Sequence, residues 1–142
     1  EFDLRERMKK PGSIFIAEDA VSGSGLHLIY RTLSPQGKLT TPEAVIQAAL
    51  KGQDAVAAKT LEHFISWLAR ISGDAAMALQ ARGGVYLAGG IAPSIIDRLK
   101  SGPFRTIFED KGKLSDIMRP IPVYVIVDKF PAFKGCAASL AQ

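Results

Sequence analysis

A pair of glycines between an apolar strand and a helix is the first feature of the sequence that could bind a ligand. Residues 83–93 read Gly-Gly-Val-Tyr-Leu-Ala-Gly-Gly-Ile-Ala-Pro, so a short buried strand leads into Gly89, Gly90 and Ile91, and a helix begins near Ser94. At the carboxyl end of a parallel strand, glycines let a ligand approach bare backbone, and the helix end supplies free N–H groups. A tight turn that needs a positive φ is the alternative interpretation, and the pattern is not the Gly-x-Gly-x-x-Gly dinucleotide fingerprint.

Other residues that could carry chemistry are weaker candidates. Lys111 and Lys113 could approach an anion, but we interpret them as part of an exposed basic loop. His27 and His63 lie in expected helices without a partner at metal-ligand spacing, which favours structural roles and no metal site. Cys136 is the single cysteine, which excludes an internal disulfide and a cysteine-based zinc site. We expect it to be a small buried residue rather than a nucleophile.

Composition describes an ordinary globular protein. The 142 residues suffice for one compact domain, and 47% of them are hydrophobic and 23% charged. The net charge of +4 includes a basic cluster, for which we expect a solvated helix face rather than a nucleic-acid interface. The cluster consists of Arg5, Arg7, Lys9 and Lys10. No apolar run approaches the ~20 residues that span a bilayer, and no signal peptide opens the chain, so we expect a cytoplasmic protein without membrane contact.

The elements that must position these residues alternate between helices and two apolar strands. Capping residues, glycines and apolar spacing predict helices at 1–10, 26–33, 42–51, 54–81, 94–100, 104–109, 114–118 and after Pro131. Residues 13–25 are expected to be extended or loop-like. Strands are expected at 85–88 and 123–127, and their continuous apolar character is typical of a parallel sheet. Because two parallel strands do not make a stable sheet alone, the remaining strands are expected upstream of residue 1.

The long helix expected over 54–81 carries a continuous apolar stripe at spacings of three and four. Phe64, Ile65, Trp67 and Leu68 lie on adjoining faces of it, which suggests more apolar surface than one neighbouring layer covers. A two-fold dimer through these helices is therefore expected. Gly73 costs ~1 kcal/mol relative to alanine inside a helix, which indicates either a close helix crossing or a local kink.

Four segments, in order, resemble segments of bacterial-type ATP-dependent glucokinases, which belong to the actin-like ATPase superfamily. The glycine turn resembles that family's adenosine motif. Residues 17–26 resemble the segment that ends in Ser-Gly-Pro-Gly-Leu, and Leu-Ile-Tyr-Arg follows at 28–31. The other two segments are Phe-Glu-Asp-Lys-Gly-Lys at 108–113 and Ile-Pro-Val-Tyr at 121–124. Together the resemblance covers nearly the whole chain from about residue 13.

The resemblance implies a fold and a division of the chain. It implies an α/β fold, the C-terminal part of a ribonuclease-H-like or actin-like kinase, rich in helices and with a few mostly parallel strands. Residues 1–130 would form the C-terminal part of the large domain, with 1–12 a possible leader or non-native segment. Residues 131–142 would form a terminal helix that returns to an N-terminal domain.

The resemblance also implies ligands. Gly89, Gly90 and Ile91 would lie against the adenosine of ATP, and Glu18 would accept hydrogen bonds from glucose hydroxyls. A carboxylate suits that role because it accepts hydrogen bonds and can hold two hydroxyls at once, although a surface glutamate that caps a turn is the alternative. The intact enzyme would use ATP and Mg²⁺ to phosphorylate the 6-hydroxyl of glucose, and it would be a homodimer.

The departures from the family pattern limit these expectations. Ser24 replaces the usual proline, and residues 130–135 differ from the usual Asn-Pro-Gly-Leu-Leu-Gly. The family's Asp-Gly-Gly-Thr-Asn, Asn-Asp and Glu-Gly-Gly-His motifs occur nowhere in these residues, so no catalytic residue is assigned and the chain alone is expected to be inactive. A kinase for another hexose, or a non-catalytic sugar-sensing or dimerisation domain, is the alternative.

Overall fold

The computed structural model describes residues 2–9 and 12–141. The helices, in chain order, are α1 Phe2–Met8, α2 Ala17–Val21, α3 Gly23–Leu33, α4 Pro42–Leu50, α5 Ala55–Ala78, α6 Ile91–Ser94, α7 Ile96–Ser101, α8 Phe104–Glu109, the 3-10 helix η1 Gly112–Leu114, α9 Ser115–Met118 and α10 Pro131–Leu140. The strands are β1 Val85–Leu87 and β2 Val123–Val125. This arrangement confirms the expected helix-rich α/β fold.

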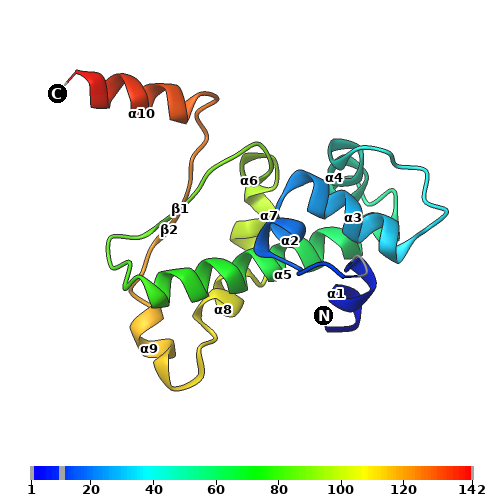
Figure 1. Ribbon diagram of the computed structural model, residues 1–142, viewed down its shortest axis with the longest axis horizontal. Coiled ribbons are helices and arrows are strands. Elements are labelled where there is room, and N and C mark those ends of the chain that lie inside the picture. The colour runs from blue at the N-terminus through cyan, green and yellow to red at the C-terminus, as the bar shows by residue number, and fades with distance from the viewer. Residues whose placement is uncertain (1, 10–11, 142) are drawn as a thin grey trace.

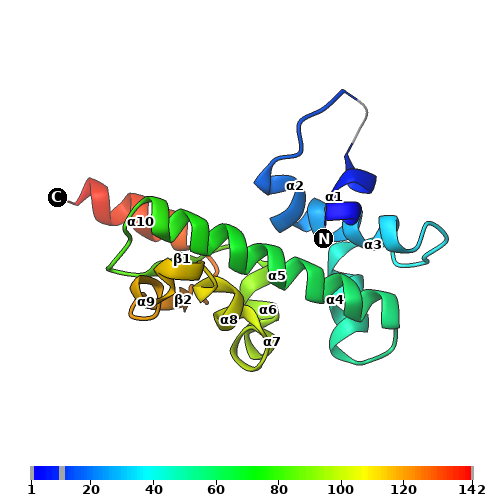
Figure 2. The same cartoon turned by 90° about the horizontal axis from the view of Figure 1, so that it is seen from below.

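Helix α5 is the central element, and α2, α3, α4, α8 and α9 contact it (Figure 1). Asp54 begins it as an N-cap, because its Oδ1 accepts the backbone N–H groups of Val56 and Ala57 at 2.7 and 2.9 Å. Helices α2, α3 and α4 pack against α5, and so does α8. Figure 2 shows α1–α3 on one side of α5 and the strands with α6–α9 on the other. A helix covered in this way is buried on more than one side.

The apolar stripe of α5 is covered within one chain. Phe64, Ile65 and Trp67 are buried, Leu68 is half-buried, and the ring of Phe15 meets the Trp67 ring edge-on at 5.9 Å. The expectation that this stripe is more than one neighbouring layer covers is therefore confirmed, whereas the inference that it leaves an apolar surface free for a dimer is wrong. The reason is that the stripe meets more than one layer, since helices contact α5 on both of its sides.

Gly73 lies where α5 and α8 approach each other closely. A Cβ at this position would lie 2.6 Å from the carbonyl oxygen of Phe108, so a larger residue does not fit. Of the two expected alternatives, the close helix crossing is confirmed, and α5 continues through Gly73 as helix.

Strands β1 and β2 pair in parallel, as expected, with Val85 opposite Val123 and Leu87 opposite Val125. Among the described residues the sheet consists of these two strands. Leu87 is buried, whereas the exposed rings of Tyr86 and Tyr124 stack with their centroids 4.9 Å apart. The face of the sheet that carries Leu87 is thus covered, whereas the face that carries Tyr86 and Tyr124 is exposed.

The two ends of the chain differ in how they join the body. Helix α1 buries Leu4 and Met8, and its Arg7 guanidinium donates a 2.6 Å hydrogen bond to the Thr32 carbonyl. Lys10 of the basic cluster lies outside the described residues. Helix α10 stands apart in Figure 1, and residues 132–141 are exposed. Cys136 is therefore exposed rather than buried, because among the described residues no element covers this part of α10.

Several boundaries differ from the sequence expectations. Residues 17–21 form helix α2 instead of a loop, and α3 begins at Gly23 rather than near Leu26. The helix expected at 94–100 is two helices, α6 and α7, which meet at Ile95. Both strands are shorter than expected.

Within the described part of the chain, no helix combines the length and the apolar character needed to cross a membrane.

Candidate functional site

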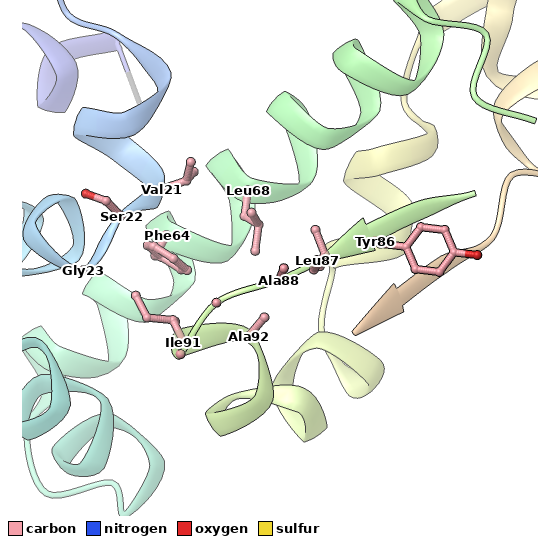
Figure 3. Close-up of a pocket in the computed structure, with 12 residues that line it drawn as sticks. Val21, Ser22, Gly23, Phe64, Leu68, Tyr86, Leu87, Ala88, Ile91 and Ala92 are labelled. Atoms are coloured by element: carbon pink, nitrogen blue, oxygen red, sulfur yellow. The ribbon is translucent and has the colours of Figure 1, made fainter. Parts of the chain in front are cut away.

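A cavity of about 540 Å³ lies between the start of α3, the middle of α5 and the turn after β1 (Figure 3). Its walls come from three segments that are distant in the sequence. The lining residues are Val21, Ser22, Gly23, Phe64, Leu68, Tyr86, Leu87, Ala88, Gly89, Gly90, Ile91 and Ala92. The structure thus brings Gly89, Gly90 and Ile91, the residues singled out from sequence, into one cavity.

The turn after β1 presents bare backbone to this cavity. Gly89 has a φ of +113°, a conformation that residues with a side chain rarely adopt, so glycine is required there. A Cβ added to Gly89 or to Gly90 would meet no described atom within 4 Å. Glycine is therefore needed for the backbone conformation, and the absence of side chains leaves open space where a ligand could lie.

Apolar side chains form the wall opposite the glycine turn. Phe64 and Leu68 project from successive turns of α5, and Val21 projects from α2 (Figure 3). Buried Leu87 and Ala92 hold the two ends of the turn against the core. A cavity with an apolar wall on one side and bare backbone on the other suits a flat, partly apolar group.

The corner between α2 and α3 forms the third side of the cavity. Ser22 caps α3, because its Oγ accepts the Gly25 N–H at 3.0 Å and lies 2.9 Å from the Ser24 Oγ. A Cβ at Gly25 would lie 2.5 Å from the Asp19 carbonyl oxygen, so the corner can close only with glycine there. Ser24, the departure from the family's proline, adds a hydroxyl beside this cap.

Glu18 lies in the first turn of α2 with its side chain exposed, and it does not line the cavity. Its neighbour Asp19 takes the capping role at this helix start, since the Asp19 Oδ2 accepts the Ile16 N–H at 2.9 Å. Glu18 is thus not needed to cap the turn. Its role toward sugar stays a prediction.

Lys111 is not part of an exposed loop, which corrects the sequence interpretation. Its side chain is only 8% exposed, and its Nζ lies 2.7 Å from the Asp74 Oδ1 and 3.4 Å from the Arg70 carbonyl oxygen. The stem passes beside Gly73, where a Cβ would come within 2.9 Å of the lysine Cε. Lys113, in contrast, is exposed as expected.

The two histidines have packing contacts rather than metal-site geometry. His27 Nε2 lies 3.1 Å from the Leu39 carbonyl oxygen, and the His63 ring lies 6.5 Å from the Trp67 ring. In the part of the chain that the structure describes, no three His, Cys, Asp or Glu side chains are grouped so that they could hold a metal ion.

Sequence reasoning found the turn but missed the opposite wall and the helix corner. Phe64 and Leu68 are spaced four apart on the α5 stripe, so the sequence marked them as apolar but not as cavity-lining. Ser22 and Gly23 belong to the segment at 17–26, whose residue types do not indicate a cavity. No local signal shows that these segments converge, because their convergence depends on how α2, α3 and β1 pack against α5.

The parallel strands, the covering helices and the glycine turn after β1 define a helix-rich α/β domain. The family model described as Glucokinase matches residues 1–142, and the chain belongs to the glucokinase family.

Curated relatives and a solved structure agree with this assignment. The chain is 43% identical to a glucokinase of Campylobacter jejuni subsp. doylei over 136 residues, which cover 93% of this chain and 41% of the relative. It is 42% identical to a glucokinase of Helicobacter pylori over 134 residues, which cover 87% of this chain and 40% of the relative.

A crystal structure of a glucokinase from an Antarctic psychrotroph superposes with a TM-score of 0.83 at 28% identity. This match covers 98% of the present chain and 45% of the crystallised one. The chain therefore spans less than half the length of the relatives that it matches.

Proposed function

We propose that these residues supply the adenosine-binding turn and one sugar-binding carboxylate of a glucokinase. That enzyme would transfer the γ-phosphoryl group of ATP to the 6-hydroxyl of glucose. The observation that carries the proposal is the bare backbone turn at Gly89 and Gly90, which faces an apolar wall across one cavity. Family membership supports it independently.

The cavity suits the adenosine part of ATP. A purine ring is flat and largely apolar on its faces, so it can lie between the Gly89–Gly90 backbone and the side chains of Phe64 and Leu68. A Cβ at either glycine would occupy the same space as the ligand. The turn would therefore hold adenosine by close contact, and phosphoryl transfer depends above all on such positioning.

Glu18 would hold the sugar from α2, one helical turn before the cavity-lining Ser22. Its side chain is exposed, so sugar hydroxyls can reach both carboxylate oxygens and donate hydrogen bonds to them. The short α2–α3 corner, closed by Gly25, fixes the distance between this carboxylate and the cavity. Sugar and nucleotide would thus be held by adjoining elements.

The remaining catalytic groups are not assigned to this chain. No residue here is proposed as the base that takes the proton from the 6-hydroxyl. When bound, Mg²⁺ would neutralise charge on the triphosphate, and we assign it no ligand among the described residues.

We also propose that α10, whose side chains from 132 to 141 are exposed, returns to an N-terminal domain and packs there.

A coupled assay with glucose, ATP and magnesium tests this proposal on two samples. We expect a full-length protein containing these residues to phosphorylate glucose, whereas residues 1–142 alone should show no turnover, because general base catalysis is worth about 10²–10⁴-fold. Circular dichroism of the isolated chain shows whether it is helical under the assay conditions. Turnover that rises with the concentration of the isolated chain would contradict the division of roles.

A further inference from the structure

Arg105 in α8 donates hydrogen bonds to backbone carbonyls of the turn that precedes β2. Its Nη1 donates to the Ile121 oxygen at 2.7 Å, and its Nη2 donates to the Arg119 oxygen at 2.6 Å and the Met118 oxygen at 3.4 Å. The Nε donates to the Glu109 carboxylate, and the guanidinium lies 5.1 Å from the centre of the buried Phe108 ring. One side chain thus joins α8 to three backbone carbonyls, at positions 118, 119 and 121, on either side of Pro120.

The Met118 carbonyl accepts the Ile121 N–H at 3.0 Å, whereas the Arg119 and Ile121 carbonyls need a donor from outside the turn. Pro120 and Pro122 have no N–H group, so they cannot supply the hydrogen bonds that a helix end and a strand start ordinarily receive from their own backbone. Ile121 is buried, which makes an unpaired carbonyl there costly. The planar guanidinium can reach several carbonyls at once, whereas the ammonium of a lysine is a point donor.

This turn sets the position of both strands. The Pro122 carbonyl, next to Ile121, accepts the Val85 N–H at 2.9 Å, and the Leu87 carbonyl accepts the Ile126 N–H at 2.9 Å. β1 therefore takes its register from the segment that begins at the Arg105-held turn. Gly89 follows the end of β1 by two residues, so the position of the glycine turn depends on that register.

We propose that Arg105 is a positioning residue for the nucleotide turn: by fixing the 118–121 carbonyls to α8, it holds β2, and through β2 it holds β1 and Gly89 at the height that adenosine binding requires. This inference rests on the proposed function of the cavity. Arg105 does not line that cavity, and it acts through the sheet alone.

The test compares Arg105→Lys and Arg105→Ala in the full-length protein. The lysine variant keeps the aliphatic stem over Phe108 and one positive charge. It therefore allows the measurement to be made even if the alanine variant fails to fold. We expect Arg105→Lys to raise KM for ATP about tenfold, since hydrogen bonds to charged groups of this kind are lost, and to leave KM for glucose unchanged. Hydrogen exchange of the amides at 85–90 should become faster.

Arg119→Ala is the matched control. It removes an arginine of the same turn whose side chain is exposed and pairs with Asp116, while keeping the Arg119 carbonyl that Arg105 holds. We expect it to change neither KM for ATP nor exchange at 85–90. A similar effect from both arginines would show that charge on this turn, and not the carbonyl contacts, matters.

Gly89→Ala separates this inference from the proposed function. If Gly89→Ala leaves KM for ATP unchanged, the cavity is not the nucleotide site, and exchange at 85–90 in Arg105→Lys still decides whether Arg105 positions the turn. If Gly89→Ala raises KM for ATP and folded Arg105→Lys leaves both KM and exchange at wild-type values, the inference is wrong. Equal changes in KM for ATP and for glucose would likewise overturn it, because they indicate a general structural role.

Discussion

At the level of single residues, Glu18 and Asp19 have different roles at the start of α2, and this difference determines whether Glu18 is available to a ligand. Both carboxylates lie in the first turn of α2, where acidic side chains interact favourably with the helix dipole. Asp19 points back to the Ile16 N–H and is occupied there. Glu18 remains exposed, so a sugar could reach it without breaking a structural contact.

Substituting Glu18 by glutamine in the full-length protein tests this role. The amide keeps the shape but replaces one acceptor by a donor, so KM for glucose should rise by about tenfold or more while KM for ATP changes far less. Glu43→Gln, an exposed glutamate in the first turn of α4, is the control and should change neither constant. An unchanged KM for glucose in Glu18→Gln would show that the assignment is wrong.

Other residue-scale interpretations failed because burial depends on distant neighbours. Lys111 follows an acidic pair in a short polar stretch, which is typical of an exposed loop, yet its stem crosses the groove left by Gly73 and its ammonium reaches Asp74. Cys136 belongs to a residue type that is usually buried, but no other element covers α10. Neither outcome can be predicted without knowing which helix packs where.

At the scale of elements, strong caps made the longer helices predictable. Asp54 caps α5, and Thr41 caps α4 by accepting the Ala44 N–H at 3.1 Å. Helices α2 and α6 have only five and four residues, too few to show an apolar period. The sequence pattern therefore does not separate α2 from a loop or α6 from α7.

Asp54 gives α5 a pH-dependent contribution to stability. The N–H of Ala57, together with Tyr30 and Val56, lowers the pKa of this carboxyl below its ordinary value, while burial and the hydrogen bond to Asp54 raise the pKa of the Tyr30 hydroxyl. Because the folded-state pKa of Asp54 is depressed, its stabilisation is fully present above the unfolded pKa, near 3.8. It is lost as the pH falls through the folded-state value.

Asp54→Asn should therefore lower the free energy of unfolding at neutral pH by about 0.3–1 kcal/mol and reduce its dependence on pH in the acid range. The amide can still cap α5, but it lacks the charge that interacts with the helix dipole and with the Tyr30 hydroxyl. Urea unfolding at pH 7 and at pH 3, followed by circular dichroism, measures both effects. Asp97→Asn, at an exposed position in α7, is the control. Equal losses at both pH values would contradict the charge-based account.

At the scale of the whole molecule, the candidate site depends on packing that no single segment encodes. The glycine turn could be predicted because its residue types and its place after an apolar strand are local features. The cavity also needs the α2–α3 corner and the middle of α5, which approach the turn only when α5 lies between the two sides of the fold. The parallel pairing of β1 and β2 was predictable from their apolar character, while their short length was not.

The packing of the whole molecule changes the surface through which we expect the chain to self-associate. The middle of α5 is buried within one chain, so it cannot form a dimer interface. Exposed apolar side chains lie elsewhere: Leu114 and Ile117, 44% and 58% exposed, border a hollow beside Met77, and Phe133 and Leu140 lie on α10. Apolar surface of this kind marks interfaces, and two-fold closure is the commonest way to bury it.

We therefore expect residues 1–142 to form a dimer in solution through the Leu114–Ile117 surface. Light scattering over a wide concentration range measures the mass, and Ile117→Asp should shift it toward the monomer because a charge at the interface loses its hydration. Leu140→Asp on α10 is the matched comparison and should leave the dimer intact. If Leu140→Asp dissociates the dimer and Ile117→Asp does not, α10 forms the contact instead. A monomeric mass for the unmodified chain at high micromolar concentration would show that neither surface binds a second copy, and that the expected dimer does not form through these residues.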